Sequence, residues 1–366
     1  MGMDAFNSNS YRIEYNVLGY QREMMSLLVD KERWKSGFIY TRKYAAQHPE
    51  TGKYYYDDDF FSPYILYRIG GKIGIDVPET ELKHVSYRNR EFMSLSQSYT
   101  QSSIVYDPAY SYLAHPTGNN GHRRYIHQEN VYEMYLNEHY KGEERYERKM
   151  PPGLGIQRMQ IDDYINANVE YLRKYGSKPS EDYTENEIKD WKQELITRAL
   201  LGLRLGIHGH FNIETTYGWN ARLCSYFLAS DNMFCLGDPE MYVQEYINME
   251  DKDLKSLLDR ISIPQYYLYP QQDIESLYSR DVITYIYEHY PQEAERAYER
   301  LSKFTQKDLE EILGECSQMS ESHKKLALRI FRIRTQEYDQ IHQQHIKTQE
   351  NEQTGSKDVK PQGEDR

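Results

Sequence analysis

Two histidines near the middle of the sequence lie in a segment whose polar side chains could bind a metal ion or move a proton. His208 and His210 are two residues apart, and Asn212 and Glu214 follow at the same spacing. Imidazole and carboxylate groups are good ligands for zinc or iron, and a neutral imidazole can accept a proton near pH 7. No third metal ligand stands at a defined position, so the segment predicts either a metal centre or a polar, hydrogen-bonded loop.

Asp231 and Lys43 are the other two candidates for chemistry. Asp231 follows the apolar run 227–229, where a carboxylate can bind a cation or can help to form the turn that ends a strand. Lys43 lies near the end of residues 37–44, which are rich in aromatic and β-branched residues and alternate in polarity. That pattern predicts a strand. Taken alone, a lysine at the end of a strand is a solvated charge.

A helix predicted over residues 184–205 must position the histidine segment. Thr184 and Glu187 have the spacing of a capping box, in which the two side chains satisfy free amide groups of the first turn. The apolar face that we expect to be buried consists of Ile188, Trp191, Leu195, Ala199 and Leu203. The predicted order is therefore a helix, a polar loop at 206–212, and a short strand that leads to Asp231.

Residues before about 116 predict an α+β region. After the strand at 37–44, a helix is expected to start at Ser62 as the N-cap, with Pro63 at the first helical position, and to stop at Gly74. Its buried stripe would be Ile65, Ile69 and Ile73. Residues 91–97 predict a further strand.

From residue 121 onward the patterns are mainly helical. Helices are predicted over 128–140, 161–176, 184–205, around 254–258, over 274–290 and 293–301, from the N-cap Thr305 to 316, and from about 320 to 346. Residues 347–366 are polar and lack aromatic residues, which predicts a disordered tail. The predicted organisation is an N-terminal α+β lobe at 1–116, a helical C-terminal lobe at 117–346, and the tail.

Composition excludes several classes of function. The chain of 366 residues has a formal net charge of −12 without a long basic block, which disfavours nucleic-acid binding. No apolar run approaches the ~18 residues of a membrane span. The three cysteines share no metal-ligand spacing and fit a reducing compartment. With no hydrophobic signal core at the N-terminus, we expect a cytoplasmic protein.

In chain order, these elements resemble the HipA-like kinases, a bacterial branch of the protein-kinase-like fold. The resemblance extends over roughly residues 35–340. The segments that carry it are the strand with Lys43 and its following helix, then 74–82, 93–99, 125–135, 227–237, 304–313 and 324–338. It implies a two-lobed α+β fold with a small β-containing N-terminal lobe and a large, mostly helical C-terminal lobe.

The resemblance also implies a site for ATP and Mg²⁺. Kinases of this fold use a strand lysine oriented by a helix glutamate, a loop aspartate as base, and an Asn and an Asp for the metal ions. Lys43 matches the lysine that contacts the nucleotide, and Asp231 matches a metal-binding Asp. Asn212 matches the metal-binding Asn approximately.

Two of the expected groups are missing. The position at which the family has its helix glutamate is Pro63 here, and the nearest carboxylates are at 57–59. The family loop reads Asp-x-His-x-x-Asn, whereas residues 207–212 contain no Asp. Aligning the histidines places His208 at the base position, and aligning Asn212 places Ile207 there. Phosphoryl transfer depends on positioning and electrostatics, so both losses favour a degenerate, pseudokinase-like protein.

Three hypotheses follow. The first is a HipA-like fold with little or no phosphotransfer that acts by binding a protein partner. The second is an active, divergent ATP- and Mg²⁺-dependent serine/threonine kinase that acts on a protein substrate and uses His208 or Glu214 as the base. The third is a helical protein-interaction module unrelated to kinases, which predicts a structure without a β-containing N-terminal part.

Overall fold

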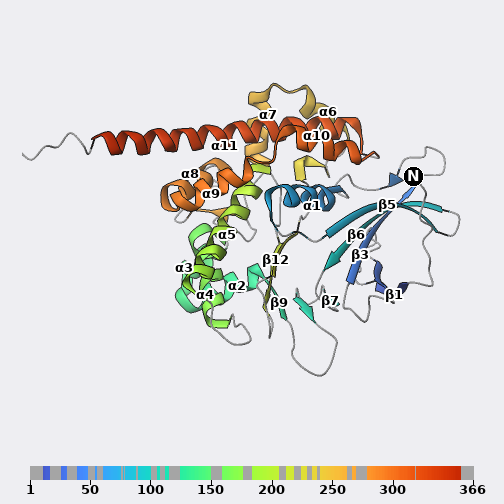
Figure 1. The fold of residues 1–366 in the computed structure, drawn as a ribbon, viewed down its shortest axis with the longest axis horizontal. Helices are drawn as coiled ribbons and strands as arrows, with labels where there is room; N and C mark the ends of the chain where they lie inside the picture. Colours follow the sequence, from blue (N-terminus) through green and yellow to red (C-terminus); the bar gives the residue numbers. More distant parts are fainter. Residues whose placement is uncertain are drawn as a thin grey trace, which may run out of the picture.

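The structure of the chain is a computed structural model, which describes part of the sequence. The described residues are 11–16, 26–30, 39–47, 54–55, 61–75, 77, 79–87, 90–99, 105–107, 112–114, 124–149, 159–175, 184–205, 212–217, 224–228, 233–236, 240–261, 266–268, 278–317 and 319–355. Figure 1 shows a large sheet on one side of the molecule, helices on the other, and one long helix along the top.

A six-stranded antiparallel sheet contains the strand with Lys43. Its strands are β1 (Tyr11–Asn16), β2 (Ser26–Asp30), β3 (Ile39–Gln47), β4 (Tyr54–Tyr55), β5 (Glu79–Tyr87) and β6 (Arg90–Tyr99). The order is β1-β2-β3-β6-β5, with β4 paired to β3. The strands predicted over 37–44 and 91–97 are thereby confirmed as β3 and β6.

Helix α1 (Ser62–Ile73) lies between β4 and β5 in the chain and contacts β5. The predicted stripe is confirmed, because Ile65, Ile69 and Ile73 are buried, and Gly74 ends the helix in the left-handed conformation at φ 71°. The predicted N-cap is wrong by one residue. Phe61 is the N-cap and makes no side-chain capping bond, since a phenylalanine side chain has no oxygen that could accept from the free amides of the first turn.

A second, five-stranded sheet follows. It consists of β7 (Val105–Asp107), β8 (Tyr112–Ala114), β9 (Arg124–His127), β11 (Asn212–Tyr217) and β12 (Cys224–Leu228), in the order β12-β11-β9-β8-β7. The sequence predicted only the end of β12. Strand β11 was missed, although Ile213, Thr215 and Tyr217 alternate with polar residues as strand residues do. Its first residue, Asn212, therefore belongs to a strand and not to a loop.

The first helical group is built around a central helix, α5. It comprises α2 (Gln128–His139), α3 (Gly142–Lys149), α4 (Ile161–Tyr175) and α5 (Glu185–Leu205), with the short parallel pair β10 (Met159–Gln160) and β13 (Tyr266–Tyr267) beside them. The capping box of α5 is confirmed. The amide of Thr184 donates to Glu187 at 2.9 Å, and the amide of Glu187 donates back to the Thr184 hydroxyl at 3.3 Å. Every residue from Leu195 to Leu205 is buried.

The second helical group follows β12. It comprises the 3₁₀ turn η3 (Met233–Cys235), α6 (Glu240–Asn248), α7 (Asp251–Ile261), α8 (Ser279–His289), α9 (Pro291–Leu301), α10 (Gln306–Glu315) and α11 (Glu321–Gly355). Helix α6 was not predicted. A continuous cluster of buried apolar side chains joins α1 to both helical groups. None of the helices that the structure describes combines the length and the apolar character needed to cross a membrane.

Helix α11 is longer than predicted. It extends to Gly355 and therefore includes the first part of the segment 347–366, for which the composition predicts disorder. Contacts one turn apart support this end: the Thr348 hydroxyl donates to the Gln344 carbonyl at 3.0 Å, and Gln349 bonds to His345 at 2.8 Å. Figure 1 shows this end of α11 projecting from the body of the molecule.

Candidate functional site

The hairpin of β11 and β12 places Asn212 and Leu228 at the same end of a sheet. Asn212, the first residue of β11, is opposed to Leu228, the last residue of β12. The chain therefore enters and leaves this hairpin at one end. His208 precedes Asn212 by four residues, and Asp231 follows Leu228 by three. His208 and Asp231 themselves lie outside the described residues.

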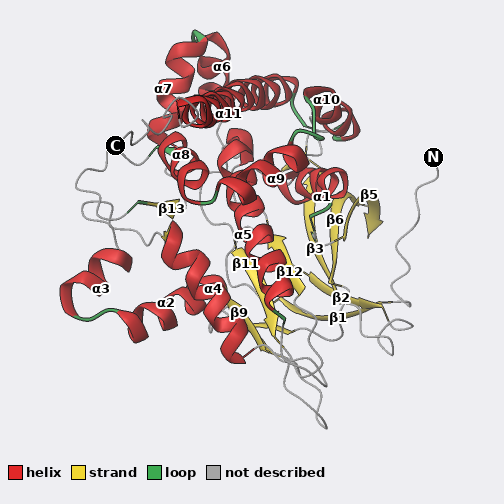
Figure 2. Cartoon of the chain, turned by 60° about the vertical axis from the view of Figure 1, so that its left-hand side comes forward, coloured by secondary structure: helices red, strands yellow, loops and turns green. Residues whose placement is uncertain are grey.

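Glu214 lies two residues further along β11. It is opposed to Tyr226 in β12 and to His127 in β9, so it is in a central strand of the second sheet. Residues two apart in a strand lie on the same face. Glu214 is thus on the face of the sheet to which Asn212 belongs. Figures 1 and 2 both show this sheet between helices α2 and α4 and the larger sheet.

Lys43 is placed by the register of the six-stranded sheet. It is opposed to Leu95 in β6, and Leu95 is opposed to Leu82 in β5. The three residues form one row across the sheet, and residues directly opposed in an antiparallel sheet lie on the same face. Leu82 packs against the hydrophobic core that includes the buried stripe of α1. The row containing Lys43 thus belongs to the face of the sheet on the side of α1.

Helix α1 supplies no carboxylate to this face, because residues 62–73 contain no Asp or Glu. Its two cations are both paired with α10. Arg68 forms an ion pair with Glu315, which also accepts from the Tyr64 hydroxyl. Lys72 donates to Asp308 at 2.7 Å. No position of α1 therefore offers a carboxylate.

Arg300 of α9 makes the contacts at the end of α1 that sequence patterns did not reveal. Its Nε donates to the carbonyl of Ile73 at 2.6 Å, and its Nη2 donates to the carbonyl of Gly74. Its Nη1 forms an ion pair with Glu194 of α5. A basic residue near a helix end is too common a pattern to have singled it out.

A second arginine joins α5 to α9. Arg204, near the end of α5, donates to the carbonyl of Leu301, the last residue of α9. Its guanidinium lies 5.4 Å from the ring centre of Phe331 and 5.8 Å from that of Tyr338. Burial lowers the pKa of Arg204, and the two aromatic faces partly compensate for the lost hydration of the cation.

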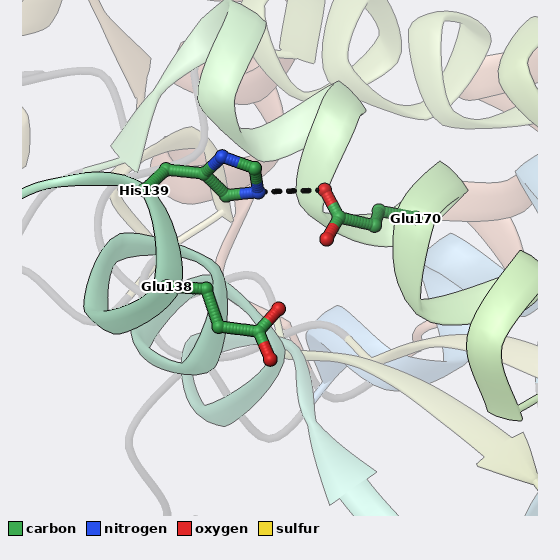
Figure 3. A group of neighbouring side chains, drawn as sticks. All are labelled: Glu138, His139 and Glu170. Carbon is green, nitrogen blue, oxygen red and sulfur yellow. Dashed lines mark hydrogen bonds and ion pairs between the residues drawn. The ribbon is translucent and has the colours of Figure 1, made fainter.

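Glu138, His139 and Glu170 form a separate cluster between α2 and α4 (Figure 3). Their ligand atoms lie within 4.8 Å of one another. However, His139 is bonded to Glu170 at 2.8 Å, and Glu138 is paired with Lys174. Each carboxylate thus has a cationic or hydrogen-bonding partner from the protein, so the cluster is accounted for as an ion-pair link between two helices.

The fold resembles that of a known kinase. The chain is similar to the crystal structure of the Helicobacter pylori proinflammatory kinase CtkA, with a TM-score of 0.57 and 13% sequence identity. The match covers 94% of this chain and 99% of that chain. No protein-family model and no curated protein matches the sequence. At this level of identity, the similarity establishes a kinase-like fold and leaves the activity to be argued from the residues.

Proposed function

We propose that this chain is a divergent, two-lobed HipA-like kinase that binds ATP and Mg²⁺ but has lost efficient phosphotransfer, and that it acts by binding a protein partner. The N-terminal lobe, predicted as residues 1–116, would contain the six-stranded sheet, and the C-terminal lobe, predicted as residues 117–346, would contain the two helical groups. The second sheet has β7 and β8 before residue 116 and β9, β11 and β12 after it, so it would join the two lobes. The similarity in fold supports a kinase-like protein. Nucleotide binding and the loss of phosphotransfer are argued from the residues at the site.

The observation that carries the proposal is the composition and pairing of α1. A kinase holds its strand lysine in place with a carboxylate from the helix beside the sheet. Here α1 has no carboxylate, and both of its cations pair with acidic residues of α10. Helix α1 consequently offers Lys43 no carboxylate that would orient it for catalysis, although a lysine can still contact phosphate oxygens as a point charge.

The metal-binding half of the site is retained in this proposal. Asn212 and Asp231 would bind Mg²⁺, which prefers oxygen ligands and substrate phosphates. The end of the hairpin at Asn212 and Leu228 supports this assignment, since both candidate ligands are within three residues of it in the chain. Bound Mg²⁺ would neutralise phosphate charge and thereby help to hold the nucleotide.

Thermal unfolding with and without ATP and Mg²⁺ tests the proposal. A ligand present at about 100 times its dissociation constant adds about 2.7 kcal/mol to the free energy of unfolding. We expect a stabilisation by ATP–Mg²⁺ that is lost in Lys43→Ala and in Asp231→Ala, together with no phosphate incorporation above the no-enzyme level. The absence of any shift at millimolar ATP would refute nucleotide binding.

An active kinase is the second candidate, and the position of Glu214 favours it. Glu214 is on the same face of its sheet as Asn212, so it could accept the substrate hydroxyl proton; His208, four residues before Asn212 in the sequence, is the alternative base. This candidate predicts Mg²⁺-dependent phosphate incorporation that disappears in Glu214→Gln or His208→Gln. The third hypothesis, a module unrelated to kinases, is wrong in its structural prediction, because the six-stranded sheet is present.

A further inference from the structure

The guanidinium of Arg300 lies at a junction of three helices. All three of its nitrogen atoms donate: Nε and Nη2 to the carbonyls of Ile73 and Gly74, and Nη1 to Glu194. Arg300 belongs to α9, the carbonyls end α1, and Glu194 is in α5. A single side chain thus connects α1 with α5, two helices that are more than 100 residues apart in the sequence.

The contacts at Ile73 and Gly74 are at the joint between α1 and the large sheet. The last carbonyls of a helix lack intrahelical donors and carry partial negative charge, so a cation there is favourable. Beyond Gly74 the chain turns back across α1 into β5. A Cβ at Gly70 would lie 2.5 Å from Cγ2 of Val77 and 2.9 Å from the carbonyl oxygen of Ile75. This close contact leaves the joint little freedom to shift.

Glu194, at the other end of the connection, is also held by more than one contact. Glu194 also accepts from Arg198 at 2.9 Å, so its carboxylate has two cationic partners. From Leu195 onward α5 is fully buried, and Arg204 bonds to the end of α9. Helix α5 ends at Leu205, directly before residues 206–212. Arg300 thus joins α1, which contacts the sheet containing Lys43, to α5, which leads to residues 206–212.

We propose that Arg300 is a positioning residue for the nucleotide site. It sets the distance between the sheet that contains Lys43 and the hairpin that begins at Asn212 without touching the nucleotide. The inference rests on the proposed nucleotide binding. Arg300 holds α1 through the carbonyls of Ile73 and Gly74.

The test is the ATP–Mg²⁺ affinity of three variants, measured by titration calorimetry at a temperature at which circular dichroism shows each of them to be folded. Arg300→Gln and Glu194→Gln remove the two ends of the ion pair. Arg296→Gln is the matched control, because Arg296 is exposed and one helical turn earlier in α9. Residues that act on a site through intervening contacts typically change affinity about two- to thirty-fold.

We expect Arg300→Gln and Glu194→Gln each to weaken ATP–Mg²⁺ binding by that factor, and the double variant to be no weaker than the worse single variant. Arg296→Gln should bind as the wild type does. A purely structural role would lower the melting temperature of Arg300→Gln but leave its affinity unchanged, and that result would overturn the inference. If the wild type itself does not bind ATP–Mg²⁺, the proposed function fails, and this inference fails with it.

Discussion

Lys72 and Asp308 connect α1 to the N-terminus of α10 through a single carboxylate. Oδ1 of Asp308 accepts from the Lys72 ammonium at 2.7 Å. Its Oδ2 accepts from the amide of Thr305 at 2.9 Å and from the Thr305 hydroxyl at 2.7 Å. Lys72, and then the Thr305 donors, lower the pKa of Asp308 to about 2. Asp308 therefore caps α10 and, through Lys72, holds α1 against it.

Replacing Asp308 with Asn should reduce both stability and its dependence on pH. A carboxylate whose pKa is depressed in the folded state contributes stability above its unfolded pKa of about 3.9, and that contribution is lost as the pH falls through the folded value of about 2. We expect Asp308→Asn to lower the free energy of unfolding by about 1 kcal/mol at pH 6. Urea unfolding at pH 6, 4 and 3 should show this difference shrinking.

Glu310→Gln is the control for this measurement, because Glu310 is an exposed acid two residues further along α10. It should change the free energy of unfolding by less than about 0.5 kcal/mol at each pH. An equal pH dependence in the two variants would contradict the special role of Asp308.

Two adjacent glycines of α1 should respond in opposite ways to replacement by alanine. In a helix interior, Ala is favoured over Gly by about 1 kcal/mol. A Cβ at Gly71 would have no heavy atom within 4 Å, whereas a Cβ at Gly70 would lie 2.5 Å from Cγ2 of Val77. We expect Gly71→Ala to raise the free energy of unfolding by up to about 1 kcal/mol. Gly70→Ala should lower it, because the chain that leads into β5 must move. Chemical unfolding of the two variants measures both effects, and stabilisation by Gly70→Ala would show that this segment yields readily.

The elements that sequence patterns predicted well are those with local signals. The capping box at Thr184, the Gly74 stop and the four-residue spacing of Ile65, Ile69 and Ile73 each depend on residues within one or two helical turns. Strand β11 lacks such a signal. It is stabilised by pairing with β9 and β12, and β9 is more than 80 residues away in the sequence, so its existence depends on tertiary contacts.

The sequence predicted which catalytic groups are missing from the site better than it predicted the contacts that the structure shows around α1. The absence of a carboxylate in 62–73 can be read directly from the sequence, and the structure adds that this segment is the helix that contacts β5. The pairing of Lys72 with Asp308 and of Arg300 with Glu194 joins residues more than 100 positions apart. One sequence contains no local pattern for such ion pairs, because each partner alone resembles a solvated charge.

Asp163, at the start of α4, should be among the residues whose loss destabilises the helical part most. It is buried, and it accepts from Arg148 at 2.6 Å and from the Tyr140 hydroxyl at 2.9 Å. Asp163→Ala removes the buried carboxylate that Arg148 and Tyr140 share, while Arg148 keeps its ion pair with Glu144 at 3.2 Å, so we expect a loss of about 1–3 kcal/mol. Urea unfolding should show this loss, and Asp190→Ala, at an exposed position of α5, should stay within about 0.5 kcal/mol of the wild type. The double variant Asp163→Ala/Arg148→Ala should be less destabilised than the sum of the single variants, and full additivity would contradict the pairing.

The loss of the helix glutamate should not be reversible by one substitution in α1. Ile69 is fully buried in the stripe that packs into the core, so Ile69→Glu would bury a charge unless Lys43 lies within reach of it. Without a partner, the carboxylate is disfavoured relative to a neutral amide of the same shape. We therefore expect Ile69→Glu to be less stable than Ile69→Gln at pH 8, and the gap to narrow at pH 5, where the carboxyl can take up a proton. Urea unfolding of both variants at the two pH values measures this difference. A Glu variant more stable than the Gln variant, with an advantage that disappears in the Lys43→Ala background, would show that α1 can still orient the lysine. The site would then be one substitution away from the kinase arrangement.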